Sequence, residues 1–227
     1  MNSASTLRVY YESLLAAYGP RQWWPAQTPF EVMVGAILVQ STAWQSVEVS
    51  IARLKAAHAL APAAMLALTH EELSTIIRPS GFMQRKASTL KSLCRWLVER
   101  YSANVAWAAQ QPSQQIREEL LSIPGIGPET ADAVLLYALG HPVFVVDEYM
   151  RRIVTRHGLA PANAIYVQLQ QLGDSAFQSD TDRAQHFNEF HALIVEVGKQ
   201  HCRRRPICSG CPLAVYLPQG AIANPVQ

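Results

Sequence analysis

Helix-start signals recur along the whole chain of 227 residues, and no stretch alternates apolar and polar side chains for long enough to form a sheet. At Thr28, an N-cap residue is followed by Pro29 in the first turn and by Glu31 as the partner of a capping box. Thr69 is the N-cap of a second helix start of the same kind. The sequence therefore predicts an all-α fold. Helices are expected over residues 5–18, 28–39, 43–57, 84–101, 113–121, 128–139, 148–157, 162–171 and 182–199.

The composition is that of a globular protein. Hydrophobic residues make up 49% of the chain and charged residues 16%, which excludes a disordered chain. Apolar stretches such as 30–39 and 59–68 are shorter than the roughly 20 residues that span a bilayer, and the polar start shows no secretory signal. We expect a cytoplasmic protein. Because the formal net charge is only +2, binding to a polyanion would require basic residues gathered on one face.

The most informative stretch runs from Leu120 to Gly158. Gly125 and Gly127 flank one apolar residue between two expected helices, so the backbone can reverse tightly and present amide N–H groups to a phosphate. A glycine turn that only joins two helices is the alternative. Farther along, Asp147 follows an extended apolar run and precedes a helix, which places its carboxylate at an N-cap.

Together these features resemble the helix-hairpin-helix DNA glycosylase superfamily. Residues 123–131 are similar to the family's hairpin, His141-Pro142 to the link after it, and 145–147 to the segment that presents an essential aspartate. The resemblance implies that Asp147 is the catalytic residue. Its negative charge would support a sugar that becomes oxocarbenium-like as a flipped-out base leaves.

The same resemblance implies two helical lobes that flank a DNA-binding cleft. One lobe would be discontinuous, formed by residues 1–25 and 136–227, and would end in the cysteine loop. The other, residues 26–135, would contain the helix-hairpin-helix motif. Bifunctional relatives similar to endonuclease III place a lysine in the hairpin's second helix, where this chain has Glu129. Since a carboxylate cannot form an imine, Glu129 predicts a monofunctional glycosylase.

Within the superfamily, the chain is most similar to the 3-methyladenine DNA glycosylase III group, through residues 23–25, 36–42 and 78–82. An aromatic pocket that attracts a cationic purine is implied. The residues expected to bind the base are Trp23, Trp24, Pro25, Trp44 and Lys199. The alternative for the three tryptophans is packing in the protein core, and the alternative for Lys199 is a solvated position on the surface.

DNA contacts are expected from the end of one helix and from the hairpin. Gln40 corresponds to a residue that fills the gap left by the flipped base in relatives, with an ordinary polar helix end as the alternative. The hairpin residues expected to bind DNA are Gly125, Ile126, Gly127 and Thr130. Further candidates for phosphate contacts are Arg85, Lys86, Lys91, Arg151, Arg152 and the run Arg203-Arg204-Arg205.

Three of the four cysteines, Cys202, Cys208 and Cys211, crowd into ten residues, which in a reducing compartment indicates a metal before a disulfide. The loop resembles the iron–sulfur loop that ends endonuclease III-type glycosylases. The fourth ligand of that loop would stand at Leu217, so the cysteine set for a [4Fe–4S] cluster is incomplete. Two interpretations stay open: a cluster whose fourth ligand is His201 or a nonprotein group, and a metal-free loop.

The leading hypothesis is a monofunctional DNA glycosylase of base excision repair that hydrolyses the N-glycosidic bond of alkylated purines such as 3-methyladenine. One alternative is a bifunctional endonuclease III-like glycosylase and lyase that acts on oxidised pyrimidines. The other is a helix-hairpin-helix protein that binds DNA without catalysis. The expected partner is double-stranded DNA with damaged bases, and no binding to a membrane is expected. The expected oligomeric state is a monomer.

Overall fold

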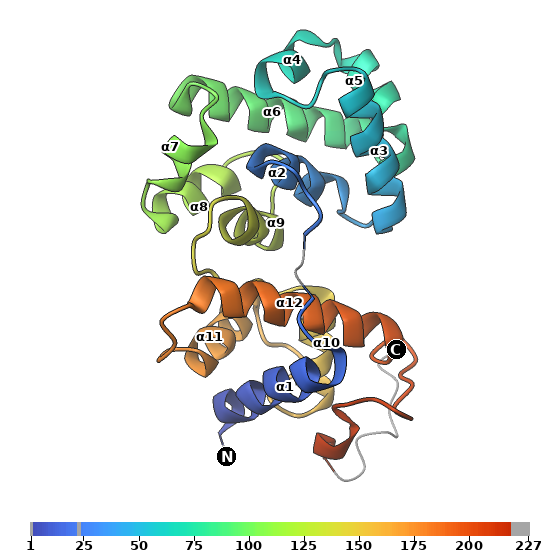
Figure 1. The fold of residues 1–227 in the computed structure, drawn as a ribbon, viewed down its shortest axis with the longest axis vertical. Coiled ribbons are helices and arrows are strands. Elements are labelled where there is room, and N and C mark those ends of the chain that lie inside the picture. The colour runs from blue at the N-terminus through green and yellow to red at the C-terminus, as the bar shows by residue number, and fades with distance from the viewer. Residues whose placement is uncertain (1, 22–23, 219–227) are drawn as a thin grey trace. The chain divides into compact units, whose positions relative to one another are not determined.

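The computed structural model describes residues 2–21 and 24–218 (Figure 1). Within these residues every regular element is a helix and no strand forms, so the predicted all-α fold is confirmed. No helix in this part of the chain has the length and apolar character needed to cross a membrane. The chain divides into two compact units, Met1–Trp23 with Pro142–Gln227, and Trp24–His141.

The discontinuous unit is built around a cluster of aromatic rings. Helix α12 packs against α1 and α10, and α1 also packs against α11 (Figure 1). The rings of Tyr11, Phe177, Phe187 and Phe190 are buried between these helices and contact one another edge to face or at a tilt. The elements of this unit are α1 (Ser3–Tyr18), α10 (Glu148–Arg156), α11 (Tyr166–Ala176), α12 (Arg183–Gln200) and the short 3₁₀ helix η3 (Ala214–Tyr216).

The continuous unit surrounds one apolar helix. Every residue of α2 (Pro29–Leu38) after its first proline is buried, and α2 packs against α3, α6, α9 and the π-helical turn η2. Cys94 is fully buried on α6, among the residues of this core. The other elements are α3 (Trp44–Ala56), α4 (Pro62–Ala67), α5 (His70–Ile76), η1 (Arg78–Ser80), α6 (Met83–Tyr101), α7 (Val105–Ala109), α8 (Ser113–Leu121), α9 (Pro128–Ala133) and η2 (Val134–Ala138).

The two expected helix starts form, with one difference. Thr69 and Glu72 make a reciprocal capping box at α5. At α2 the Thr28 side chain accepts from the Glu31 N–H, but the Glu31 carboxylate accepts from the Gln27 N–H and pairs with Lys55 instead of returning to Thr28. The first half of the box is therefore present, and the second is replaced by the hydrogen bond from the Gln27 N–H and the ion pair with Lys55.

One helix lies elsewhere than expected. The helix predicted over residues 162–171 runs from Tyr166 to Ala176. Residues 161–164 form a turn in which the Ala164 N–H donates to the Pro161 carbonyl, and the Gln168 side chain then accepts from the Ile165 N–H at the true start. A side-chain cap thus sets this start, which apolar spacing alone did not locate.

The predicted lobe boundaries, 25/26 and 135/136, differ from the boundaries of the two units, which fall at 23/24 and 141/142. The second shift has a clear cause, because η2 packs on α2 and so belongs to the continuous unit as far as the following turn. A Ser113–His141 hydrogen bond of 3.0 Å holds the end of that turn within the same unit. The role of the units as lobes around DNA stays a prediction.

Candidate catalytic carboxylate and nucleic-acid interface

Asp147 ends an extended segment and begins α10. Its Oδ1 accepts a hydrogen bond of 2.7 Å from the Met150 N–H, which confirms that it is the N-cap of the helix. The residue is 8% exposed, so its carboxylate is held in one orientation near the surface. Because Oδ1 is engaged by the backbone, Oδ2 is the oxygen that can act on another group.

The segment that delivers Asp147 is anchored by one aromatic side chain. Phe144 is buried, and its ring lies 5.2 Å from that of Phe187. On α11, a Cβ at Gly173 would collide with the Phe144 ring, so only glycine allows this approach. Gln170 Nε2 also donates to the Phe144 carbonyl at 2.9 Å. Side-chain packing and a hydrogen bond thus fix the backbone three residues before the carboxylate.

A histidine faces the same carboxylate from α12. His191 Nε2 lies 3.6 Å from Asp147 Oδ2, too long for a hydrogen bond but within ion-pair range when the imidazole is protonated. Sequence reasoning missed His191, since no local pattern links residues 44 positions apart (191 − 147). Gly198, also missed, lies farther along α12 and carries no Cβ because one would collide with Tyr149 in the first turn of α10.

Trp23, one of the residues expected to bind the base, lies outside the residues that the structure describes. Lys199 is exposed in the last turn of α12, and its carbonyl accepts from Arg203 Nε at 2.6 Å. Lys199 therefore belongs to the same unit as Asp147.

The hairpin between α8 and α9 has the expected tight geometry. Gly125 has a φ of 94°, in the left-handed region, and a Cβ at this position would collide with Thr89 Oγ1. Gly127 is exposed and is the N-cap of α9. Ile126 differs from expectation, because its side chain is buried and its N–H donates to the Ile123 carbonyl, so its amide does not point outward.

Gln40 is bound to the hairpin in this structure. Its Nε2 donates to the Gly125 carbonyl at 3.0 Å and to Thr130 Oγ1 at 2.9 Å. The end of α2 and the hairpin are therefore joined directly, and three of the residues expected to contact DNA lie together. For Gln40 to enter the DNA stack, both of these hydrogen bonds have to be exchanged for bonds to a base.

Phe82 ends the segment 78–82 that carries part of the family resemblance, but no role of its own was predicted for it from the sequence. It is 61% exposed and has a φ of 44°, which is unusual for an aromatic residue. Its loop adjoins that of Gln40, because the Thr42 hydroxyl donates to the Ser80 carbonyl at 2.7 Å. The signal available in the sequence was a large apolar residue directly after the break at Gly81.

Trp24, Pro25 and Trp44 come together in the continuous unit, as expected. The Trp24 ring lies 5.5 Å from Trp44, edge to face, and 5.0 Å from Tyr137. Gly35 makes room for the Trp24 ring, since a Cβ there would be 3.3 Å from it. Trp24 thus has packing partners on several sides, and one part of it borders a cavity that Pro25 and Trp44 also line.

This cavity has a volume of about 210 Å³ and contains charged groups as well as aromatic ones. Glu48 accepts from the Trp44 indole N–H at 3.0 Å. Glu31 also lines the cavity and is paired with Lys55 at 2.9 Å. Two carboxylates and one ammonium leave the lining with one formal negative charge in excess, which favours a cationic ligand.

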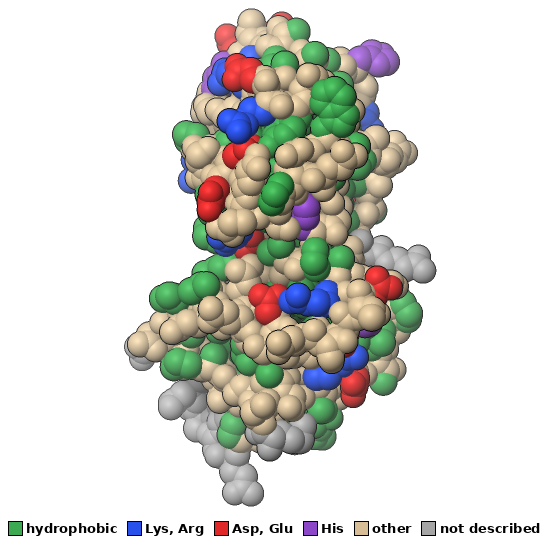
Figure 2. All heavy atoms as spheres, turned by 90° about the vertical axis from the view of Figure 1, so that its left-hand side faces the viewer, with side chains coloured by type: hydrophobic (Ala, Val, Ile, Leu, Met, Phe, Trp, Pro, Cys, Tyr) green, Lys and Arg blue, Asp and Glu red, His purple; other side chains and the backbone are tan. Residues whose placement is uncertain are grey.

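Two of the basic residues expected to contact phosphate are used inside the protein. Lys86 is 1% exposed and donates three hydrogen bonds, so that prediction is wrong for this residue. Arg151 donates to the Ala164 carbonyl. On the face drawn in Figure 2, Lys and Arg side chains are scattered among acidic ones instead of forming one patch. The face drawn in Figure 2 is therefore not the concentrated basic face that binding to DNA would require.

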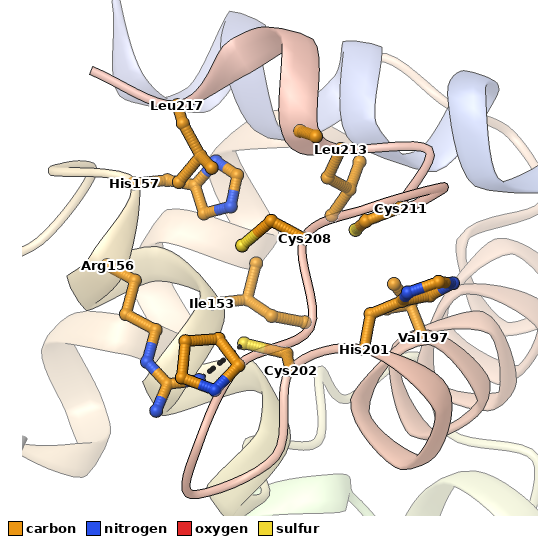
Figure 3. A pocket seen from close by; sticks show the side chains of 12 residues that line it. Ile153, Arg156, His157, Val197, His201, Cys202, Cys208, Cys211, Leu213 and Leu217 are labelled. Atoms are coloured by element: carbon orange, nitrogen blue, oxygen red, sulfur yellow. Dashed lines mark hydrogen bonds between the residues drawn. The ribbon is translucent and has the colours of Figure 1, made fainter. Parts of the chain in front are cut away.

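The cysteine loop follows α12. Cys202, Cys208 and Cys211 line one pocket together with Leu217, which stands where the fourth thiolate was expected (Figure 3). Arg156 Nη1 donates to Cys202 Sγ at 3.1 Å, and His201 uses Nδ1 to bond the Ile207 carbonyl at 2.9 Å. Within residues 2–21 and 24–218 no three His, Cys, Asp or Glu side chains are grouped to hold a metal ion. These residues do not fit a cluster with four protein thiolates.

Comparisons with known proteins agree with this architecture. Residues 34–177 match the HhH-GPD superfamily of base excision DNA repair proteins. A Methanocaldococcus jannaschii protein with a provisional name as a DNA repair glycosylase is 41% identical over 207 residues, 91% of this chain and 93% of that one. Escherichia coli endonuclease III is 29% identical over 188 residues, 81% of each chain.

A solved structure extends the comparison to the fold. The H. pylori 3-methyladenine DNA glycosylase, bound to 1,N6-ethenoadenine, is similar with a TM-score of 0.74 and 29% identity, over 88% of this chain and 98% of that one. The family match covers both the hairpin and Asp147. The chain therefore belongs to the HhH-GPD superfamily of base excision DNA repair proteins, and it is a DNA N-glycosylase of that superfamily.

Proposed function

We propose that this enzyme is a monofunctional glycosylase that releases alkylated purines such as 3-methyladenine from DNA. The observation that carries the proposal is the Asp147 carboxylate, fixed at the start of α10 with only one oxygen engaged by the backbone. As the C1′–N bond breaks, its electron pair leaves with the base and the sugar becomes positively charged. Asp147 stabilises that charge. Water then attacks C1′, forms the C1′–OH bond and releases one proton to solvent.

The aromatic cavity supports the choice of an alkylated purine. An indole face attracts a cation, and the excess carboxylate in the lining adds to this attraction. A purine nucleotide methylated at a ring nitrogen, such as 3-methyladenine in DNA, already carries positive charge, so its base leaves with little help from a general acid. The H. pylori relative with bound ethenoadenine, an alkylated adenine, supports the same substrate class. Trp24, Pro25, Trp44 and Lys199 are the proposed base-binding residues.

The continuous unit supplies the proposed DNA contacts. Gln40 and Phe82 lie on adjoining loops, and apolar side chains of this kind can enter the base stack while a polar one bonds the orphan base. The hairpin residues Gly125, Gly127 and Thr130 adjoin Gln40 and are proposed to approach the phosphate backbone.

The proposal is tested by incubating the protein with methylated duplex DNA and separating the released bases. We expect 3-methyladenine to be released and no covalent adduct to be trapped by borohydride, because Glu129 replaces the amine that would form the imine. Trapping, together with release of oxidised pyrimidines, would instead support an endonuclease III-like lyase. Binding to damaged DNA without release of any base would support a non-catalytic protein.

We also propose that protein contacts, not a metal, hold the cysteine loop. The Arg156 guanidinium donates to Cys202 Sγ and to the carbonyls of Arg203 and Arg204, the last two at 2.7 and 2.9 Å. These bonds cross the loop and tie it to α10. No step of the reaction passes through a metal in this proposal.

Substitution of Arg156 by alanine is expected to lower the free energy of unfolding by about 1–2 kcal/mol, since three hydrogen bonds at a partly exposed site are lost. Arg156→Lys keeps the charge but not the forked donors, and should recover only part of this loss. Urea denaturation measures both variants. Treatment of the unmodified protein with a metal chelator should leave the midpoint unchanged, and a lower midpoint after chelation would contradict the proposal.

A further inference from the structure

Lys86 is a buried cation in the first turn of α6. Its Nζ donates to the Leu38 carbonyl at 2.8 Å, to Thr42 Oγ1 at 2.7 Å and to the Ser80 carbonyl at 2.7 Å. All three N–H donors of the ammonium are therefore used. Lysine is almost never fully buried unless it is paired, so a side chain that is 1% exposed calls for a specific role.

The three acceptors belong to the two loops of the proposed DNA-binding surface. Leu38 ends α2 and offers a carbonyl from the negative end of the helix, which suits a cation. Thr42 lies four residues farther along, and Gln40 stands between them. Ser80 lies two residues before Phe82 on the second loop. The ammonium thus bonds both sides of the Gln40 turn and the base of the Phe82 turn.

Both turns contain non-glycine residues in the left-handed region. Ser41 has a φ of 53° and Phe82 a φ of 44°. Such conformations persist only where the surroundings hold them. Burial lowers the pKa of Lys86 to about 8, so the ammonium is mostly protonated at neutral pH and keeps its three donors. The cation is therefore in place to hold two strained turns together.

We propose that Lys86 is a positioning residue that sets Gln40, and with it Phe82, in the arrangement that engages DNA. The inference rests on the proposed glycosylase function. Lys86 does not touch DNA, because it lies beneath the loops, bonded to their backbone. It acts through the turn that carries Gln40, whose side chain is bonded at its other end to Gly125 and Thr130.

The test compares Lys86→Met with Arg100→Met in single-turnover base release from methylated duplex DNA. Arg100 is a matched control near the end of the same helix, and its Nη2 pairs with Glu119 Oε1 at 2.8 Å. We expect Lys86→Met to lower the rate at saturating enzyme by roughly 10- to 100-fold, because a misplaced loop disrupts the reacting geometry. Arg100→Met should stay within about twofold of the unmodified protein.

The same comparison in a Gln40→Ala background separates positioning from general destabilisation. If Lys86 acts through the Gln40 turn, Lys86→Met should change the rate by no more than about twofold once Gln40 is gone. Thr42→Val removes one acceptor without removing the cation, and should slow the reaction in the same direction by a smaller factor. This variant answers the question if Lys86→Met does not fold, as judged by thermal unfolding.

Three results would overturn the inference: a folded Lys86→Met protein with the unmodified rate, an equal loss for Arg100→Met, or an undiminished effect in the Gln40→Ala background. Affinity for duplex DNA with an abasic-site analogue provides a readout that needs no catalysis. Lys86→Met should weaken this affinity by about tenfold, and Arg100→Met should not. If the unmodified protein releases no base, the proposed function fails, while this affinity comparison still decides the role of Lys86.

Discussion

Replacing Asp147 with asparagine should lower the single-turnover rate of base release by at least about 100-fold, because the developing charge on the sugar loses its carboxylate. The fold should be retained, since asparagine is an equally good N-cap and can still accept from the Met150 N–H. DNA affinity should be unchanged or higher, because one negative charge near the phosphates is removed. Base release and equilibrium binding, measured on the same methylated duplex, check both expectations.

Asp182→Asn is the matched control for this substitution. Asp182 is the N-cap position of α12, it is exposed, and its side chain makes no cap hydrogen bond. The same chemical change at this position should leave base release at the unmodified rate. An Asp147→Asn protein that released base as fast as the control would contradict the catalytic role of the carboxylate, whatever its DNA affinity.

Most of the correct predictions from the sequence were local features, namely helix starts and tight turns. The N-cap at Asp147, the start at Thr69 and the tight turn at Gly125 each depend on a few neighbouring residues, and all three are present. The start of α11 was misplaced, because the Gln168 cap of Ile165 was not visible from apolar spacing. Patterns that extend over one or two helical turns were therefore enough to predict where most of the helices lie.

Contacts between segments that are distant in the chain could not be predicted from the sequence. His191 faces Asp147, and Gly173 admits the Phe144 ring, only because α11 and α12 pack around the extended segment. Lys86 was expected to contact phosphate, but its side chain is buried. Its burial depends on the contact between α6 and the end of α2, where the Leu38 carbonyl accepts from Lys86, and no local pattern predicts this contact. The same is true of the ring contact between Trp24 and Tyr137.

Gly125→Ala should both destabilise the protein and weaken DNA binding. The new methyl group would collide with Thr89 Oγ1, and the φ of 94° is strained for any residue with a Cβ. Together these effects should lower the free energy of unfolding by roughly 2–4 kcal/mol. Because the Gly125 carbonyl also accepts from Gln40, the distorted turn should lower affinity for damaged duplex DNA by about tenfold.

Gly127→Ala is the control on the same hairpin, because a Cβ at Gly127 meets no atom within 4 Å and its φ is −99°. It should leave the free energy of unfolding nearly unchanged. Adding Thr89→Ala to Gly125→Ala removes the collision but not the backbone strain, so only part of the stability should return. Urea denaturation of the three variants measures these differences. Equal stability of the two alanine variants would show that the hairpin does not depend on the left-handed glycine.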